Sequence, residues 1–305
     1  MKKVRLHIGI VLAFFVIALI FGSFFDLQIN EAIFASRDTG AGVFGIVVAA
    51  FSMIFGYAIL PLFGGAFFHA GLKQNHPIWL KVIFFVLSLA YLGVGTYYAG
   101  KEIFGPNGFD VSNIRWVGYL IALPLMCLIE ALGYFAAEKI NHEKLWILLL
   151  VISAFLALAM LGGMEGLKSV FHRPRYRIAV RENYIGFFSW WKPCKDYKSL
   201  IESVPALTKE EFKSFPSGHT GVSANLMIIA SLLPLLGKKA EKLQIPMFYC
   251  GFAFTLFVAF TRLLVGAHYL SDISMGGIVT MVCFLIANEI FINVKGLQEI
   301  AAPKE

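Results

Sequence analysis

Charged residues are scarce in this sequence of 305 residues, since Asp, Glu, Lys and Arg together make up only 15% of it. A soluble domain averages about 25% charged residues. Hydrophobic residues take their place and reach 58%, with 30 phenylalanines among them. This composition excludes an ordinary soluble globule and predicts a chain that lies largely in lipid.

Cysteine is also sparse. Of the four cysteines, Cys127, Cys250 and Cys283 lie in apolar runs, and only Cys194 lies in a polar segment. The chain contains no CxxC pair, so the pattern predicts neither a disulfide framework nor a cysteine metal site. Internal repeats and low-complexity tracts are absent as well.

No basic tail or domain carries the net charge of +7. A basic protein without such a segment is not expected to bind nucleic acid. A membrane surface and an anionic substrate account better for the positive charge.

Apolar stretches of about 20 residues recur along the whole chain and predict about eight transmembrane helices. No A-x-A-like cleavage site follows the first stretch, so we interpret it as a retained helix and not as a signal peptide. Residues 26–40 are predicted to form a polar connection after it. The predicted spans are the residues up to about 25, 42–68, 78–99, 115–137, 145–167, 218–236, 246–265 and 272–294.

These spans predict an all-α integral membrane protein with a single membrane domain over residues 1–305. The Lys and Arg residues of the short connections gather on the side of the N-terminus, which the positive-inside rule makes cytoplasmic. The cation-rich segment 168–216 would then lie outside, and we attribute several of its cations to a site. We therefore expect Lys168, His219 and His268 at the non-cytoplasmic face of the cell membrane.

Three polar clusters stand at the ends of apolar runs in the second half of the chain. The first is Lys168–Arg175, the second is Pro216–His219 and the third is Arg262–Asp272. An odd–even count of the spans places all three at the same membrane surface. Charge at a membrane boundary is costly and by default indicates a site, so the three clusters are predicted to converge.

The residue types indicate that this site binds a tetrahedral oxyanion such as phosphate. Lys168, Arg175 and Arg262 supply cations, and arginine pairs with phosphate oxygens in bidentate fashion. Ser217 can cap a helix or offer its hydroxyl, while Gly218 lets a ligand approach the backbone closely. Free N–H groups at a helix N-terminus also favour an anion.

Two histidines and a carboxylate complete the set. His219 and His268 suit a two-step transfer with a nucleophile and a proton donor. Asp272 follows His268 by four positions, so on a helix the two would share a face and hydrogen-bond. Simpler interpretations exist: Lys168 and Arg173 as snorkelling cations at the membrane edge, and the His268–Asp272 pair as a helix-end ion pair.

Taken together, the clusters resemble the tripartite signature of the type 2 phosphatidic acid phosphatase (PAP2) superfamily, K-x6-RP, PSGH and SR-x5-H-x3-D. The resemblance covers roughly residues 168–272. Two positions depart from the pattern, because Tyr176 stands in place of a proline and Thr261 in place of a serine. Neither departure removes a charge or a nucleophile.

The resemblance implies a fold and a set of roles. The family core has six spans, and extra N-terminal helices account for the rest of the eight. We expect the PAP2-like core over residues 115–294 and additional N-terminal helices and loops in residues 1–110. His268 would be the nucleophile that forms a phosphohistidine, Asp272 its supporting carboxylate and His219 the general acid. The phosphate cradle would consist of Lys168, Arg175, Ser217, Gly218 and Arg262. Neither a metal nor another cofactor is expected.

The sequence thus predicts a metal-independent membrane phosphatase for a lipid phosphate or pyrophosphate. Phosphatidate, phosphatidylglycerophosphate and polyprenyl pyrophosphate all qualify. The alternatives are a phosphatase for a soluble sugar phosphate and a non-enzymatic transporter of anions or lipids. The expected partners are membrane lipids and the phosphorylated lipid substrate, and the oligomeric state is not predicted. We expect residues 176–215 to shape substrate choice.

Overall fold

The computed structural model describes residues 2–36, 38–105, 112–179, 185–205 and 207–294, and every regular element within these ranges is a helix. Eight helical stretches are long and apolar enough to cross a membrane. The predicted all-α integral membrane protein with eight spans is therefore confirmed.

The elements of the first half are α1 (Lys2–Ile33), α2 (Gly40–Tyr57), α3 (Ile59–Lys73), α4 (Ile78–Ile103), η1 (Ser112–Ile114) and α5 (Arg115–Ile140). Those of the second half are α6 (Leu145–Ala157), the π-helix η2 (Leu158–Glu165), α7 (Gly166–Phe171), α8 (Tyr176–Ala179), α9 (Tyr197–Ser203), η3 (Lys209–Phe212), α10 (Gly218–Ser223), α11 (Asn225–Ser231), η4 (Leu233–Leu236), α12 (Lys238–Glu241), α13 (Gln244–Leu264) and α14 (Leu270–Asn293). Some spans combine several elements, as α2 does with α3.

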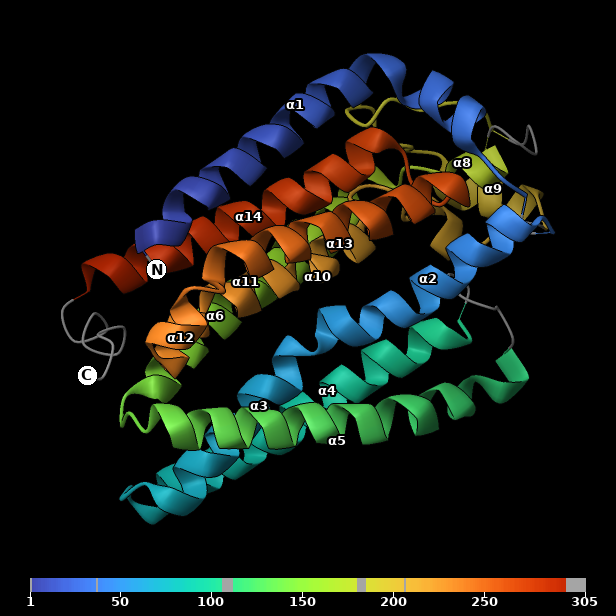
Figure 1. The fold of residues 1–305 in the computed structure, drawn as a ribbon. Coiled ribbons are helices and arrows are strands. Elements are labelled where there is room, and N and C mark those ends of the chain that lie inside the picture. Colours follow the sequence, from blue (N-terminus) through green and yellow to red (C-terminus); the bar gives the residue numbers. More distant parts are fainter. Residues whose placement is uncertain (1, 37, 106–111, 180–184, 206, 295–305) are drawn as a thin grey trace.

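The helices form two groups (Figure 1). Helices α3, α4 and α5 pack against one another, whereas α1 packs along α14 with α13 beside it. Helix α2 connects the groups, because it contacts α4 on one side and α10 and α13 on the other. The start of α1 and the end of α14 lie at one end of the bundle, and α8 and α9 lie at the other.

The packing of α3 on α5 depends on a glycine. A Cβ on Gly65 would overlap the backbone carbonyl of Glu130, so the two helix backbones touch there. Small residues permit this approach between membrane helices. The Glu130 carboxylate is partly buried at this contact, and its Oε1 accepts a hydrogen bond of 2.6 Å from the Ser88 hydroxyl.

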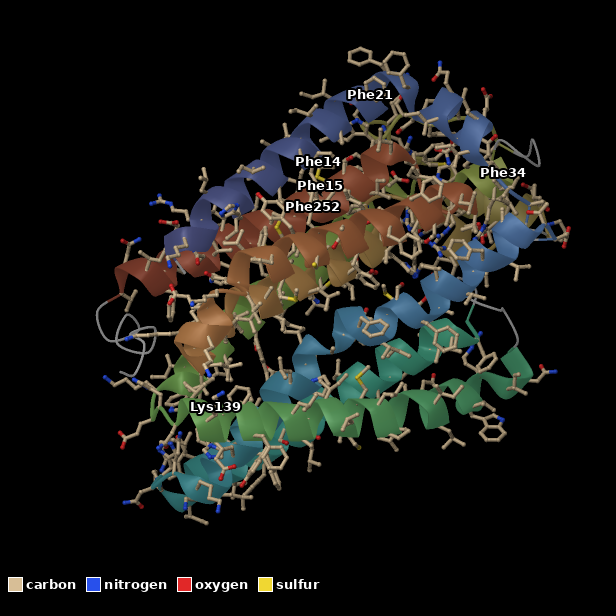
Figure 2. The ribbon with its side chains drawn as sticks, in the orientation of Figure 1. Phe14, Phe15, Phe21, Phe34, Lys139 and Phe252 are labelled. Atoms are coloured by element: carbon tan, nitrogen blue, oxygen red, sulfur yellow. The ribbon has the colours of Figure 1, made fainter. Side chains whose placement is uncertain are left out.

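Phenylalanines fill the interface between α1 and α13. Phe14 and Phe15 of α1 both contact Phe252 of α13, with ring centroids 5.3 and 5.9 Å apart (Figure 2). Aromatic pairs at this separation contribute about 0.5–1.5 kcal/mol beyond the area they bury. These contacts hold α1 against the second half of the chain.

Helix α1 is longer than the sequence pattern predicts. The predicted polar connection over residues 26–40 is wrong up to Ile33, since these residues continue the helix. Gly22, Asp26 and Asn30 recur every four residues, and the side chains of Asp26 and Asn30 are buried. The polar residues extend the helix because they find partners inside the protein instead of in water.

Candidate active site

The structure brings the three predicted clusters together at one end of the bundle. The backbone N–H of Ser217 donates to the carbonyl of Asp272 at 2.9 Å, which joins the second cluster to the third. Lys168 Nζ lies 3.3 Å from the point where a Cβ on Gly218 would stand, which joins the first to the second. The centroids of the His219 and His268 rings lie 6.5 Å apart, with the ring planes tilted by 54°.

The first cluster follows a sharp turn. Helix α7 ends at Phe171, and the left-handed backbone of its C-cap residue His172 (φ 44°) turns the chain back into the protein. The His172 ring stacks on Tyr197 at 3.7 Å, outside the converged cluster. The turn directs Arg173 and Arg175 inward, and both are buried.

The second cluster opens a helix, as predicted. Ser217 is the N-cap of α10, and its Oγ accepts hydrogen bonds from the backbone N–H and the hydroxyl of Thr220 at 3.4 and 3.1 Å. Capping by serine satisfies N–H groups that the first turn leaves without partners. The cap fixes where His219 enters the site.

His268 occupies a loop and not a helix, because α14 begins only at Leu270. The prediction that His268 and Asp272 share a helix face is therefore wrong. His268 Nδ1 lies 2.6 Å from the carbonyl oxygen of Ser214, and Asp272 Oδ2 is farther away at 3.8 Å. Because a carbonyl oxygen only accepts, Nδ1 carries the proton and Nε2 keeps its lone pair.

The surroundings of His268 keep its ring neutral. Burial lowers the pKa of His268 from 6.5 to about 3, the Asp272 carboxylate opposes this shift, and the positive charges of Arg175 and Arg262 add to it. A buried imidazole without a proton on Nε2 is a nucleophile at neutral pH.

The Asp272 carboxylate bonds to two neighbours of His268: Ser214, which contacts the His268 ring, and Tyr269, which follows His268 in the chain. Its Oδ2 accepts hydrogen bonds from the Ser214 hydroxyl at 2.5 Å and from the Tyr269 backbone N–H at 2.8 Å. Its Oδ1 pairs with Arg173 Nη1 at 2.5 Å. The carboxylate thereby fixes the loop that carries His268 relative to the segment that precedes α10.

The predicted cradle cations come from three different segments. Lys168 pairs with Glu165 at 2.6 Å. Arg175 is anchored by backbone carbonyls, with Nε bonded to Glu210 at 3.0 Å and Nη1 to Ala267 at 3.2 Å. Arg262 is completely buried near the end of α13. All three cations lie within electrostatic reach of the His219 ring.

The His219 ring is buried, and its Nε2 has no hydrogen-bond partner among the described residues. Glu102 Oε2 of α4 lies 3.6 Å from this nitrogen. A buried ring nitrogen without a partner is costly unless a ligand satisfies it. The atom is thus available to a group that enters between the two histidines.

Residues 144–294 match the family model described as the PAP2 superfamily. The chain belongs to the PAP2 superfamily. No curated protein and no solved structure matched it. The matched residues run from just before α6 to just after α14 and contain all three clusters. Membership in the PAP2 superfamily supports a phosphatase-type hydrolase.

Two acidic residues outside the PAP2 match take part in the site, and sequence reasoning missed both. Glu102 approaches His219, and Asp26 of α1 pairs with Arg173 at 2.9 Å. The signal for Asp26 is its position in an apolar run, because an intramembrane carboxylate needs a buried partner. No comparable signal marks Glu102, which lies at the end of its helix.

For Arg173, the structure differs from one of the interpretations made from the sequence. The snorkelling interpretation is wrong, since its side chain is 0% exposed and pairs with both Asp26 and Asp272. The same interpretation fails for Lys168, which points to Gly218.

The two departures from the PAP2 signature are accommodated by packing. Tyr176 is buried, with its ring 5.4 Å from Phe34 and 6.1 Å from Tyr269. Thr261 donates its hydroxyl to the carbonyl of Val258 on its own helix.

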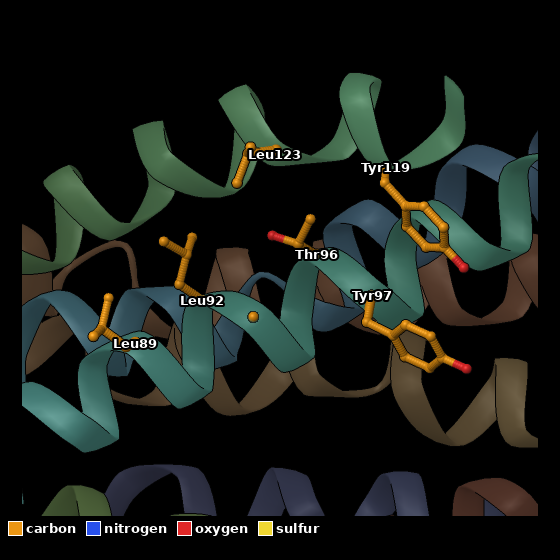
Figure 3. A pocket seen from close by; sticks show the side chains of 7 residues that line it. Leu89, Leu92, Thr96, Tyr97, Tyr119 and Leu123 are labelled. Atoms are coloured by element: carbon orange, nitrogen blue, oxygen red, sulfur yellow. The ribbon is translucent and has the colours of Figure 1, made fainter. Parts of the chain in front are cut away.

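An apolar groove of about 380 Å³ lies between α4 and α5 (Figure 3). Leu92 and the stacked rings of Tyr97 and Tyr119 form part of its wall. No residue of the PAP2 clusters lines this groove. It is therefore separate from the candidate active site.

Proposed function

We propose that the protein is a membrane phosphatase that hydrolyses a lipid phosphate or pyrophosphate through a phosphohistidine on His268. The observation that carries the proposal is the state of His268. Its Nδ1 is bonded to the Ser214 carbonyl, its ring is neutral, and its Nε2 is free to attack beside the cations Lys168, Arg175 and Arg262.

In the first step, His268 Nε2 attacks phosphorus and the bond from phosphorus to the leaving oxygen breaks. Protonated His219 donates its Nε2 proton to that oxygen. Lys168, Arg175 and Arg262 stabilise the charge on the transferring phosphoryl oxygens. Asp272 and the Ser214 carbonyl stabilise the positive charge that develops on the His268 ring.

In the second step, His219 accepts a proton from a water molecule that attacks the phosphohistidine. The bond between nitrogen and phosphorus breaks, inorganic phosphate is released and His268 returns to its neutral form. The protein groups alone supply the charge and the protons, so this scheme needs no metal ion.

A lipid substrate is supported by where the clusters lie along the spans. Lys168 and Arg175 belong to the end of one span, Ser217 precedes the next, and His268 lies between the last two. The ends of membrane spans are where lipid headgroups are expected, which favours a lipid substrate. We place the site at the non-cytoplasmic face of the cell membrane because of the distribution of cations in the short connections.

The test is phosphate release by purified protein in the presence of a chelator. The panel contains phosphatidate, phosphatidylglycerophosphate, a polyprenyl pyrophosphate and a soluble sugar phosphate. We expect release from at least one lipid substrate and a loss of about a thousandfold or more in the His268→Ala variant. Acid quenching should trap a labile phosphoenzyme in the unaltered protein only.

The matched control is His172→Asn, which changes a histidine of the first cluster that stacks on Tyr197 away from the site. Asparagine tolerates the left-handed backbone of this position. The control should keep its activity. Full activity of His268→Ala contradicts the proposed mechanism, and release from the sugar phosphate alone assigns the soluble substrate class instead.

A further inference from the structure

One face of helix α1 contacts the loop that carries His268. Asn30 Nδ2 donates to the carbonyl oxygen of His268 at 3.0 Å. A Cβ on Gly22 would lie 2.7 Å from the backbone nitrogen of Ser271, so only glycine allows this approach. Asp26 lies between these two residues on the same face. Helix α1 therefore reaches the centre of the site although it lies outside the PAP2 match.

The Asp26 carboxylate makes three contacts on this face, and it is only 2% exposed. Oδ1 accepts from the backbone N–H of Ser271 at 2.9 Å. Oδ2 accepts from the Ser271 hydroxyl and from Arg173 Nη2, the latter at 2.9 Å. Charge-assisted bonds of this kind are the strong ones inside a protein.

Arg173 lies between two carboxylates. Its Nη1 bonds to Asp272 Oδ1 at 2.5 Å and its Nη2 bonds to Asp26. Nε donates to the Phe188 carbonyl at 2.8 Å, and the guanidinium carbon lies 4.0 Å from the centre of the Tyr269 ring. Each nitrogen of the Arg173 guanidinium group thus has a hydrogen-bond acceptor, which fixes the group in one orientation.

Asp26, Arg173 and Asp272 form a buried row of charges, and the net charge of this row determines its electrostatic effect on His268. Arg173 and Asp272 alone form a neutral pair, which leaves no net negative charge beside the histidine. Asp26 adds a second carboxylate, so the buried row is negative by one charge. This net negative charge stabilises the positive charge that develops on the His268 ring during attack on phosphorus.

We infer that Asp26 is a positioning residue for the catalytic centre, which acts through Arg173 on Asp272 and hence on His268. The inference rests on the proposed role of His268 as the nucleophile. Asp26 does not contact the substrate; it orients the arginine and supplies the outer charge of the row.

The test compares Asp26→Asn with Glu31→Gln in the full-length protein. Glu31 is an exposed carboxylate on the same helix and serves as the matched control. We expect Asp26→Asn to lower kcat by about tenfold to a hundredfold, which is typical for residues that orient an active group, with KM changed less than about twofold. Glu31→Gln should leave both constants unchanged.

A double-mutant cycle separates a positioning role from a purely structural one. If Asp26 acts through Asp272, then Asp26→Asn has no further effect on kcat in an Asp272→Asn background. A purely structural role predicts that Asp26→Asn lowers only the amount of folded protein in either background, with kcat per folded molecule unchanged in the single variant. The amount of folded protein is followed by size-exclusion chromatography and thermal melting.

Ser271→Ala provides a second variant if Asp26→Asn is not recovered folded. It removes the hydroxyl that bonds both Asp26 and Arg173 and keeps every charge. We expect a kcat lowered severalfold at unchanged KM. A wild-type kcat in folded Asp26→Asn, or in Ser271→Ala where that variant replaces it, overturns the inference.

The His268→Ala variant distinguishes a failure of the proposed function from a failure of the role inferred for Asp26. If His268→Ala keeps full activity, the proposed function fails whatever Asp26→Asn does. If His268→Ala is inactive and Asp26→Asn has wild-type kcat, the proposed function stands and only the role of Asp26 fails.

Discussion

A histidine attacks phosphorus only through a ring nitrogen that carries no proton. In this protein a backbone carbonyl selects that nitrogen, because Ser214 accepts from Nδ1 of His268. Asp272 is the carboxylate expected from the signature, but its closest bonds are to Ser214, Tyr269 and Arg173. At the scale of the residue, the main effect of the Asp272 carboxylate is to fix the loop that carries His268, and its direct effect on the imidazole ring is secondary.

Because the pKa of His268 is lowered, we predict that phosphoenzyme formation persists at acid pH. With a pKa of about 3 the ring stays unprotonated above that value, so the nucleophile is present at about pH 5 as at pH 7 and is lost only in stronger acid. We expect rapid quenching of a turnover reaction to trap the same amplitude of phosphoenzyme at both pH values. A loss of amplitude centred near 6.5, where a free histidine titrates, contradicts this prediction.

Spacing within the chain predicted most of the residues in the cluster, but it could not predict Arg173. A cation at the membrane edge usually snorkels to water. Its partner Asp26 is 147 positions away, and no local pattern connects the two. Short-range periodicity likewise suggested a helix through His268, whereas Asp272 caps α14 and leaves the histidine in the preceding loop.

At the scale of the element, α4 brings a negative charge to a site built for anions. Glu102 lies 3.6 Å from His219 and is partly buried, with 17% of its side chain exposed. A carboxylate at this distance repels an anion that binds between the histidines.

We therefore expect Glu102→Gln to tighten inhibition by orthovanadate, a phosphate mimic, by about twofold to tenfold. Vanadate inhibition constants measured on purified protein check this. Glu138→Gln, an exposed carboxylate on α5, is the control and should not differ from the unaltered protein. Weaker vanadate inhibition in Glu102→Gln would show that Glu102 assists anion binding instead.

The segment between α8 and α10 has a small core of its own, of which the structure describes residues 185–205 and 207–217. Cys194, Leu207 and Phe212 are buried together. Trp190 donates to Ser23 of α1 at 2.9 Å and stacks on Phe215. The role of this segment in substrate choice stays a prediction, while its packing joins α1 to the second cluster.

At the scale of the whole molecule, hydropathy predicted the eight spans because length and apolar content are local properties. It could not predict which spans are neighbours. Helix α1 packs along α14, and α5 packs on α3 and α4. Such pairing depends on contacts such as Gly65 with Glu130, which appear only when both helices are placed. The predicted division into residues 1–110 and a core of 115–294 stays a prediction.

The orientation in the membrane is tested with single cysteines in a cysteine-free background. Lys195 is exposed in the segment that follows the first cluster, and Lys239 is exposed on α12. An impermeant thiol reagent should label Lys195→Cys on intact cells and Lys239→Cys only after permeabilisation. The reverse pattern would place the active site on the cytoplasmic face.

The pairing of α1 with α14 has a consequence for how the protein is made. During synthesis Asp26 enters the membrane long before Arg173 and Ser271 exist, and it remains a carboxylate without its partners in an apolar helix. The row of charges closes only when α14 has been inserted. A chain interrupted before α14 therefore lacks Ser271 and Asp272, so Asp26 keeps only Arg173 as a partner and the row of charges stays incomplete.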